Sequence, residues 1–157
     1  MNDITIVTHN GNFHADDVFS IAALKCVFPT FNLVRTRDLA LIAEADIVID
    51  VGGEYKAESG RFDHHQRGGA GERENGIPYS SFGLIWKKYG LAICQNNQEV
   101  ANAVDAELVS TIDAIDCGHV KAVSQGISLT QTISMFNPTW QENSHFDACF
   151  GEAVDFA

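Results

Sequence analysis

The sequence contains no apolar run that approaches the ~18 consecutive residues of a membrane-spanning helix, so an integral membrane protein is excluded. Positive charge is also scarce, because 10 Lys and Arg residues stand against 21 Asp and Glu residues and the formal net charge is −11. Proteins that bind duplex DNA present a broad basic face. We therefore expect neither duplex DNA nor a membrane as a partner.

The four cysteines are far apart and form no C-x-x-C pair, which argues against a zinc ribbon and favours free thiols in a reducing compartment. The first residues lack the basic segment of a secretory signal peptide. The chain has 157 residues, of which 45% are hydrophobic, enough for one buried core. We expect a cytoplasmic globular protein with a single domain over residues 1–157.

Segments typical of strands and of helices alternate along the first part of the chain. Short β-rich runs occur at residues 4–7, 31–34, 46–51 and 61–63, and helical segments at residues 16–24 and 39–45. This alternation predicts an α/β fold with a mainly parallel central sheet flanked by helices.

The second part of the chain is predicted to be mostly helical. A glycine-rich loop over residues 66–78 precedes a helix that starts at Ser80 and is expected to end at Gly90. Residues 98–116 have the apolar spacing of one helix, and residues 146–156 suggest a terminal helix. Residues 127–135 fit either a helix or a strand.

Histidines and carboxylates follow three of the predicted strands. In an open α/β sheet, the carboxyl ends of the strands form the edge where ligands bind. We therefore expect one group of side chains to converge there: His9, His14, Asp16, Asp50, Asp63, His64 and His65. Taken singly, each has an ordinary interpretation, such as an acid that complements a helix dipole. Taken together, they have no obvious packing purpose and indicate a metal site.

Imidazole and carboxylate ligands without thiolate suit Mn²⁺, Co²⁺ or Zn²⁺, and we favour manganese. The ligands are too many for one ion, whereas two ions ~3.5 to 4 Å apart could share a carboxylate and activate a water. Asp50 is the natural bridge. Two-metal sites of this kind typically serve in-line attack on phosphorus.

The triplet Asp63-His64-His65 resembles the signature of the DHH phosphoesterase superfamily. Its flanks resemble more narrowly the Myg exonuclease family, described as DHH-like metal-dependent enzymes linked to RNA processing. Six ordered segments carry this resemblance: residues 8–17 (THNGNFHADD), 50–53 (DVGG), 61–67 (RFDHHQR), 79–86 (YSSFGLIW), 112–116 (IDAID) and 136–140 (FNPTW).

The resemblance implies roles for individual residues. The metal ligands would be His9, His14, Asp16, Asp50, His64 and one aspartate of the pair Asp113 and Asp116, of which we favour Asp116 and keep both. Asp50, Asp63 and His65 would be the catalytic residues. His65 would contact a substrate phosphate, and Asp63 would orient a ligating imidazole. Arg61, Arg67 and Arg73 could bind phosphate or form an ordinary solvated loop.

The resemblance implies a DHH-type domain that hydrolyses a phosphate-bearing small molecule, a nucleotide or a short single-stranded RNA with two divalent metal ions. Such enzymes usually carry a C-terminal substrate domain, and we expect residues 1–157 to lack it. A homo-oligomer could compensate. Two alternatives remain: a pyrophosphatase-like phosphoanhydride hydrolase, and a non-catalytic metal-binding module that serves as a partner subunit.

Overall fold

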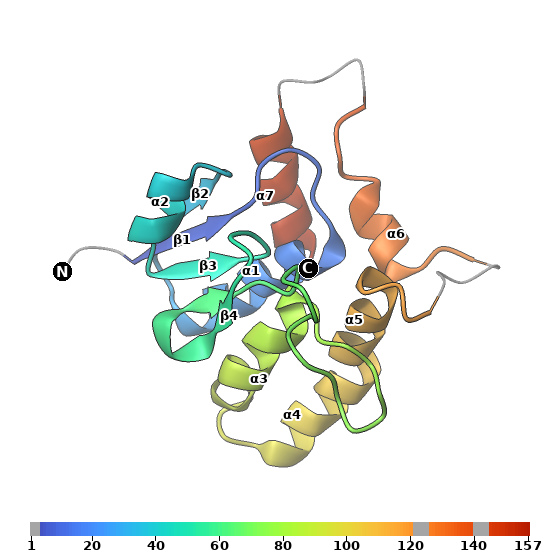
Figure 1. Cartoon of the computed structure of the whole chain (residues 1–157). Helices are drawn as coiled ribbons and strands as arrows, with labels where there is room; N and C mark the ends of the chain where they lie inside the picture. Colours follow the sequence, from blue (N-terminus) through green and yellow to red (C-terminus); the bar gives the residue numbers. More distant parts are fainter. Residues whose placement is uncertain (1–3, 121–125, 140–144) are drawn as a thin grey trace.

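A five-stranded sheet forms the centre of the protein in the computed structural model, which describes residues 4–120, 126–139 and 145–157 (Figure 1). The strand order is β2-β1-β3-β5-β4. The strands are β1 (Thr5–Thr8), β2 (Asn32–Arg35), β3 (Ile47–Ile49), β4 (Tyr55–Lys56) and β5 (Arg61–Phe62). All pairs are parallel except the edge pair β4 and β5. The predicted α/β fold with a mainly parallel sheet is confirmed, and β4 is an additional strand.

The helices are α1 (Ala15–Val27), α2 (Leu39–Glu44), α3 (Ser81–Ile93), α4 (Gln98–Val104), α5 (Ser110–Asp116), α6 (Leu129–Ser134) and α7 (Phe146–Phe156). A 3-10 turn η1 (Ala57–Ser59) and a π-helical segment η2 (Asp105–Val109) complete the elements. The segment that fitted either a helix or a strand is the helix α6. Trp140, the last residue of one motif, lies outside the described residues.

Two helical boundaries differ from the prediction. Helix α3 continues through Gly90 to Ile93. A side chain at position 90 would collide with the ring of Trp86, so the packing of this ring requires a glycine there. Gly90 therefore permits close packing inside a helix and does not end it. The predicted helix over residues 98–116 is interrupted by η2, which separates α4 from α5.

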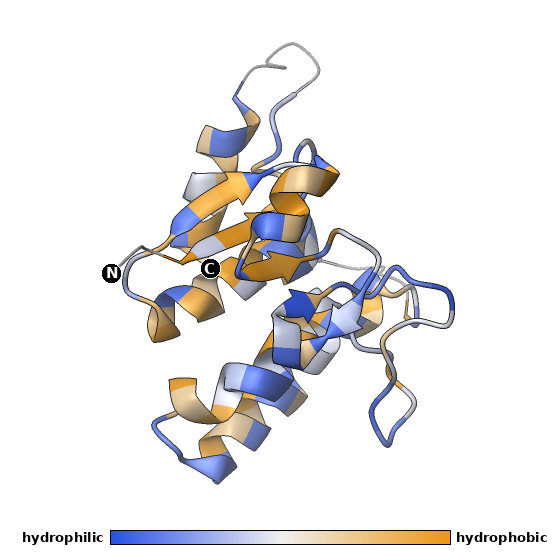
Figure 2. Cartoon of the chain, turned by 60° about the vertical axis from the view of Figure 1, so that its left-hand side comes forward, coloured by the Kyte–Doolittle hydropathy of each residue, from blue (hydrophilic) through white to orange (hydrophobic). Residues whose placement is uncertain are grey.

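The side chains of the central strands alternate between two apolar clusters, as the pleat of a strand requires. Ile6, Ile47 and Ile49 join the main core with helices α1, α3 and α7. Val7 and Val48 point to the opposite face, where α2 covers a smaller cluster. Figure 2 shows hydrophobic residues on several of the strands and hydrophilic residues on the outer loops. No helix in the described ranges is long and apolar enough to cross a membrane.

The register of the sheet aligns the strand ends. Thr8 pairs with Ile49, and Ile49 pairs with Phe62. The next residue of each strand is His9, Asp50 or Asp63, and all three are buried. The parallel register therefore gathers these side chains at one edge of the sheet, as predicted.

Candidate metal centre

Asp50 lies at the centre of a cluster of imidazole and carboxylate groups. Its Oδ2 is 3.2 Å from His9 Nε2, and its Oδ1 is 3.3 Å from both His64 Nε2 and His65 Nδ1. The hydroxyl of Ser81 donates to the same Oδ1 at 3.2 Å. Burial raises the pKa of Asp50, but the neighbouring imidazoles of His64 and His9 outweigh burial and lower it below its usual range. The two carboxylate oxygens thus face two separate groups of nitrogen atoms.

The backbone at Asp50 turns sharply, with a φ of 56° in the left-handed region. Aspartate and asparagine tolerate this conformation better than most residues. The turn ends β3 and directs the carboxylate into the cluster. A short polar residue is therefore required here by the backbone as well as by the chemistry.

His9 presents one nitrogen to two carboxylates. Its Nδ1 lies 3.2 Å from the carbonyl oxygen of Asn10, which places the proton of the neutral ring on Nδ1. Its Nε2 then directs a lone pair toward Asp17 Oδ2 and Asp50 Oδ2, each 3.2 Å away. Burial lowers the pKa of His9, but Asp50 and Asp17 outweigh burial and raise it. This nitrogen requires a proton or a cation between itself and the carboxylates.

The first turn of α1 brings two fully buried acids to the cluster. Asp17 Oδ1 accepts a hydrogen bond from the His14 amide at 2.9 Å, whereas its Oδ2 faces His9. Asp16 Oδ2 is 3.7 Å from His64 Nε2. Burial and the charge of Asp50 raise the pKa of Asp16 well above its usual value, and burial raises the pKa of Asp17 to about 7. A bound cation would offset the cost of ionising both groups.

His64 connects Asp50 to the end of α5. Its Nε2 is 3.3 Å from Asp50 Oδ1 and 3.3 Å from Asp116 Oδ2, and its Nδ1 is 3.7 Å from the Cys117 sulfur. Burial lowers the pKa of His64, but Asp50 and Cys117 reverse this effect and raise it to about 10. Asp116 is therefore positioned as a ligand beside His64.

The donor set fits a divalent metal centre. Buried polar atoms normally have hydrogen-bond partners, yet several atoms in this cluster have none among the described residues: His9 Nε2, both Asp16 carboxylate oxygens, Asp17 Oδ2 and His64 Nε2. The ligand atoms of His9, His14 and Asp50 lie within 4.8 Å of one another, as do those of Asp50, His64 and His65, and those of His14, Asp16 and Asp116. These groups could hold one or two metal ions. Asp50 belongs to two of the three groups.

Asp63 orients His65. Its Oδ2 accepts from the Gly53 amide at 2.6 Å, and its Oδ1 lies 3.1 Å from the His65 amide and 2.8 Å from His65 Nδ1. The imidazole that Asp63 fixes is therefore His65, whose side chain is 62% exposed.

A cavity of about 640 Å³ opens beside the cluster. The glycine-rich loop forms one wall, with Gly69, Ala70, Pro78 and Tyr79, and α6 forms another, with Thr130, Gln131 and Ser134. His14, Asp50, His64, His65 and Asp116 line the cavity on the side of the cluster. A small substrate in this space would contact the candidate metal ligands directly.

Comparison with known proteins gives a family. The model described as "Uncharacterised protein family (UPF0160)", for the MYG1 exonuclease, matches residues 5–157. The chain belongs to this family. The "MYG1 exonuclease" of Mus musculus is 34% identical over 96% of the chain and 46% of its own length. The "MYG1 protein" of Dictyostelium discoideum is 31% identical over 90% and 49%, and that of Chlamydia pneumoniae is 33% identical over 97% and 51%. The chain thus spans about half the length of these curated relatives. No solved structure gives a significant match.

The structure does not bring every predicted site residue of this UPF0160 member to the cluster. Arg61 donates to the carbonyl oxygens of Ala43, Ala45 and Ser59 and so ties β5 to the segment before β3. Both terminal nitrogens of its guanidinium thus hold backbone carbonyl oxygens and not groups of the cluster. Arg67 is exposed on the glycine-rich loop. The phosphate-binding expectation therefore does not fit Arg61.

Asp113 and Asp116 have different partners in the structure. Asp113 accepts hydrogen bonds from the Ser80 hydroxyl at 2.6 Å and the Gly83 amide at 3.0 Å, and it pairs with Arg73. Burial raises the pKa of Asp113 to about 6, although these donors act in the opposite direction. Asp113 is thus occupied by other partners, and Asp116 alone of the pair faces His64.

Three residues at the cluster were not predicted from the sequence: Asp17, Ser81 and Cys117. Asp17 and Ser81 lie inside two of the segments that carry the family resemblance, which was the available signal. The first-turn position of Asp17 suggested a helix-dipole role instead. Cys117 directly follows Asp116, and nothing in its spacing indicates a contact with His64.

Exchanging the two aspartates for alanine separates their roles. We expect Asp116→Ala to weaken Mn²⁺ binding by more than ~10-fold with little loss of stability, because it removes a metal ligand. Asp113→Ala is expected to leave the candidate ligands intact and to lower the free energy of unfolding by about 3–5 kcal/mol, because buried partners lose their acceptor. Mn²⁺ titration and urea unfolding measure both effects. Unchanged Mn²⁺ affinity in Asp116→Ala would exclude Asp116 from the centre.

Proposed function

We propose that this domain is a divalent-metal-dependent phosphoesterase, exonuclease-like, that hydrolyses a nucleotide or a short single-stranded RNA. One observation carries the proposal: the two oxygens of the buried Asp50 carboxylate face separate histidine groups, and buried nitrogen and oxygen atoms around them make no hydrogen bond within the described residues. The relatives named exonucleases support the same chemistry.

The residues divide into ligands and substrate-binding groups. His9, His14, Asp16, Asp50, His64 and Asp116 would hold two divalent ions, for which we propose Mn²⁺, with Co²⁺ or Zn²⁺ as alternatives. Bound ions would supply an activated water and stabilise charge on phosphoryl oxygens. The Asn10 carbonyl oxygen at Nδ1 keeps His9 oriented, and the Ser81 hydroxyl keeps Asp50 oriented.

His65 is the proposed contact to the substrate phosphate. Asp63 accepts a hydrogen bond from Nδ1 of His65, and Nε2 of the ring therefore points away from Asp63. Nε2 can donate a hydrogen bond only when the ring is protonated. A charged imidazole at the mouth of the cavity would bind a phosphoryl oxygen more strongly than a neutral one.

Hydrolysis assays test the proposal. Protein purified without chelator and supplied with Mn²⁺ is offered bis(p-nitrophenyl) phosphate, pyrophosphate and a short single-stranded RNA. We expect cleavage of the phosphodiester or the RNA, and loss of activity with EDTA. Cleavage of pyrophosphate alone would identify the phosphoanhydride hydrolase instead. Bound metal without turnover on any substrate would identify a non-catalytic module.

The adjacent histidines provide a second, finer test. His64→Ala is expected to lower Mn²⁺ affinity, because its Nε2 lies between two carboxylates. His65→Ala is expected to retain Mn²⁺ and to slow turnover by ~10²-fold or more, as for other lost charge-stabilising groups. Electron paramagnetic resonance of Mn²⁺ together with steady-state kinetics separates the two effects. Equal loss of Mn²⁺ in both variants would contradict this division.

A further inference from the structure

Arg73 is the buried anchor of the glycine-rich loop. Its side chain is 8% exposed, and its Nη1 lies 2.5 Å from Asp113 Oδ2. Its Nε and Nη2 donate to the two oxygens of Asp105 at 3.2 and 2.8 Å, and its guanidinium lies 4.5 Å from the centre of the Tyr79 ring. In the described part of the chain, no other side chain of residues 66–78 makes a polar bond to another element. The loop therefore depends on one arginine for its polar attachment.

The π-helical segment explains how one arginine meets two acids of the same helical stretch. Asp105 and Asp113 are eight residues apart, which would place them about 80° apart around a regular α-helix. The wider turn of η2 accommodates roughly one extra residue. This correction brings the two carboxylates to within about 20° of each other. Single π turns of this kind occur frequently at functional sites.

Asp113 transmits this attachment to the start of α3. Its Oδ1 accepts from the Ser80 hydroxyl and the Gly83 amide, whereas its Oδ2 pairs with Arg73. The residue between them, Ser81, donates to Asp50 Oδ1. Hydrogen bonds therefore link the loop to Ser80 and Gly83, and the backbone at the start of α3 connects these residues to Ser81 and its bond to Asp50.

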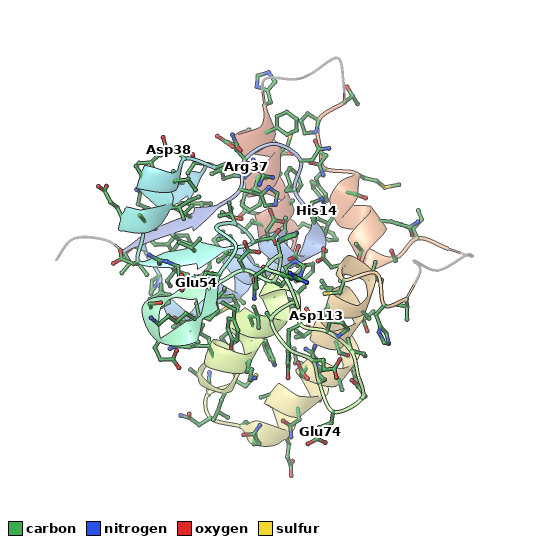
Figure 3. All side chains as sticks on the ribbon, viewed as in Figure 1. His14, Arg37, Asp38, Glu54, Glu74 and Asp113 are labelled. Atoms are coloured by element: carbon green, nitrogen blue, oxygen red, sulfur yellow. The ribbon has the colours of Figure 1, made fainter. Side chains whose placement is uncertain are left out.

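The same loop forms a wall of the cavity. Ala70, Pro78 and Tyr79 line it, and Arg73 lies between them in the sequence. Figure 3 shows Asp113 inside the molecule near the middle of the loop and Glu74 at its outer end. The three side-chain nitrogens of Arg73 are all directed to Asp105 or Asp113 and not toward the cavity.

We propose that Arg73 is a positioning residue of the candidate hydrolase site, which fixes the loop wall of the cavity and, through Asp113, the start of α3 that holds Ser81 against Asp50. The inference rests on the proposed function. It assigns Arg73 no direct contact with phosphate, because its donors are already bound to buried carboxylates.

The experiment compares Arg73→Gln with Arg73→Lys, Asp105→Asn and a control, Glu74→Gln, on the same loop. Glu74 is exposed, and its side chain makes no hydrogen bond or ion pair within the described part of the chain, so the control changes one charge beside Arg73 without touching the anchor. The kinetics use Mn²⁺ and bis(p-nitrophenyl) phosphate or a short single-stranded RNA, whichever the unmodified protein cleaves. Hydrogen exchange of residues 66–78 gives a readout that does not depend on activity.

We expect Arg73→Gln to raise KM by ~10-fold or more, to lower kcat, and to speed hydrogen exchange of the loop. Arg73→Lys should recover part of the activity and part of the loop's protection from exchange, since lysine keeps the charge but not the forked geometry of arginine. Asp105→Asn should give a milder form of the same changes, and Glu74→Gln should match the unmodified protein.

Unchanged KM, kcat and loop exchange in Arg73→Gln would overturn the inference. Activity losses in Arg73→Gln and Asp105→Asn that follow only the fraction of unfolded protein, without recovery in Arg73→Lys, would also overturn it by making Arg73 purely structural. If the unmodified protein neither binds Mn²⁺ nor hydrolyses any substrate, the proposed function fails, and the positioning role at that reaction fails with it. Altered loop exchange in Arg73→Gln would then show a structural anchor only.

Discussion

The variant Asp50→Asn is expected to lose Mn²⁺ binding and hydrolytic activity together while the fold is preserved. Asparagine has the size of aspartate, tolerates the left-handed backbone at this position, and keeps an oxygen for the Ser81 hydroxyl. It removes the negative charge that both histidine groups face. We expect turnover to fall by more than ~100-fold. This loss exceeds the ~10 to 100-fold loss that is typical when a residue hydrogen-bonded to a metal ligand is replaced.

Thermal unfolding with and without Mn²⁺ measures the metal part of this prediction. At 100 times its Kd, Mn²⁺ should stabilise the unmodified protein by about 2.7 kcal/mol, which is about 5–10 °C in Tm for a domain of this size. Asp50→Asn should show no such shift. Without metal, its Tm should fall, because the lowered pKa of Asp50 means that its charge is stabilised by His64 and His9 in the folded protein. A full Mn²⁺ shift in Asp50→Asn would refute the bridging role.

Gly83→Ala is expected to destabilise the protein strongly, although alanine normally favours a helix by ~1 kcal/mol over glycine. A Cβ at Gly83 would collide with the Asp113 carboxylate and would lie 2.9 Å from Tyr79 Cδ1. The collision displaces an acid that is bonded to Ser80 and Arg73. We expect the free energy of unfolding to fall by about 3–5 kcal/mol, the range for a disrupted buried ion pair.

Gly151→Ala is the matched control for this substitution. Gly151 lies in α7, and a Cβ there would meet no atom within 4 Å. Alanine should therefore stabilise the protein by ~0.5–1 kcal/mol. Urea unfolding of both variants decides the matter. Similar effects of the two substitutions would show that close approach of α3 to Asp113 does not limit the size of residue 83.

The sequence was sufficient to predict the edge of the sheet at which the candidate site lies. Parallel strand-forming runs that are followed by His9, Asp50 and Asp63 bring these residues to one edge of the sheet. The adjacency of β1, β3 and β5, which makes the residues neighbours, comes from the strand order and register of the structure. The choice between Asp113 and Asp116 required more. Their spacing of three residues suggests a common helical face, whereas packing against α3 directs Asp113 to Ser80 and leaves Asp116 beside His64.

The arginines show the same limit. Arg61 and Arg73 are equally basic in the sequence, and no local pattern reveals that one holds backbone carbonyl oxygens and the other two buried carboxylates. Their partners are distant in the chain and depend on how the helices pack. Gly90 was misinterpreted for a related reason, since the ring of Trp86, and not a turn, requires a glycine there.

The most direct test of the metal centre is a crystal structure of the protein grown with Mn²⁺ and measured at the manganese absorption edge. We expect two anomalous peaks about 3.5–4 Å apart, one on each side of the Asp50 carboxylate, with His9 bound to one ion and His64 to the other. If the protein binds Mn²⁺ stoichiometrically in solution but the crystal shows no anomalous peak within ligand distance of Asp50, the bridging role of Asp50 is wrong.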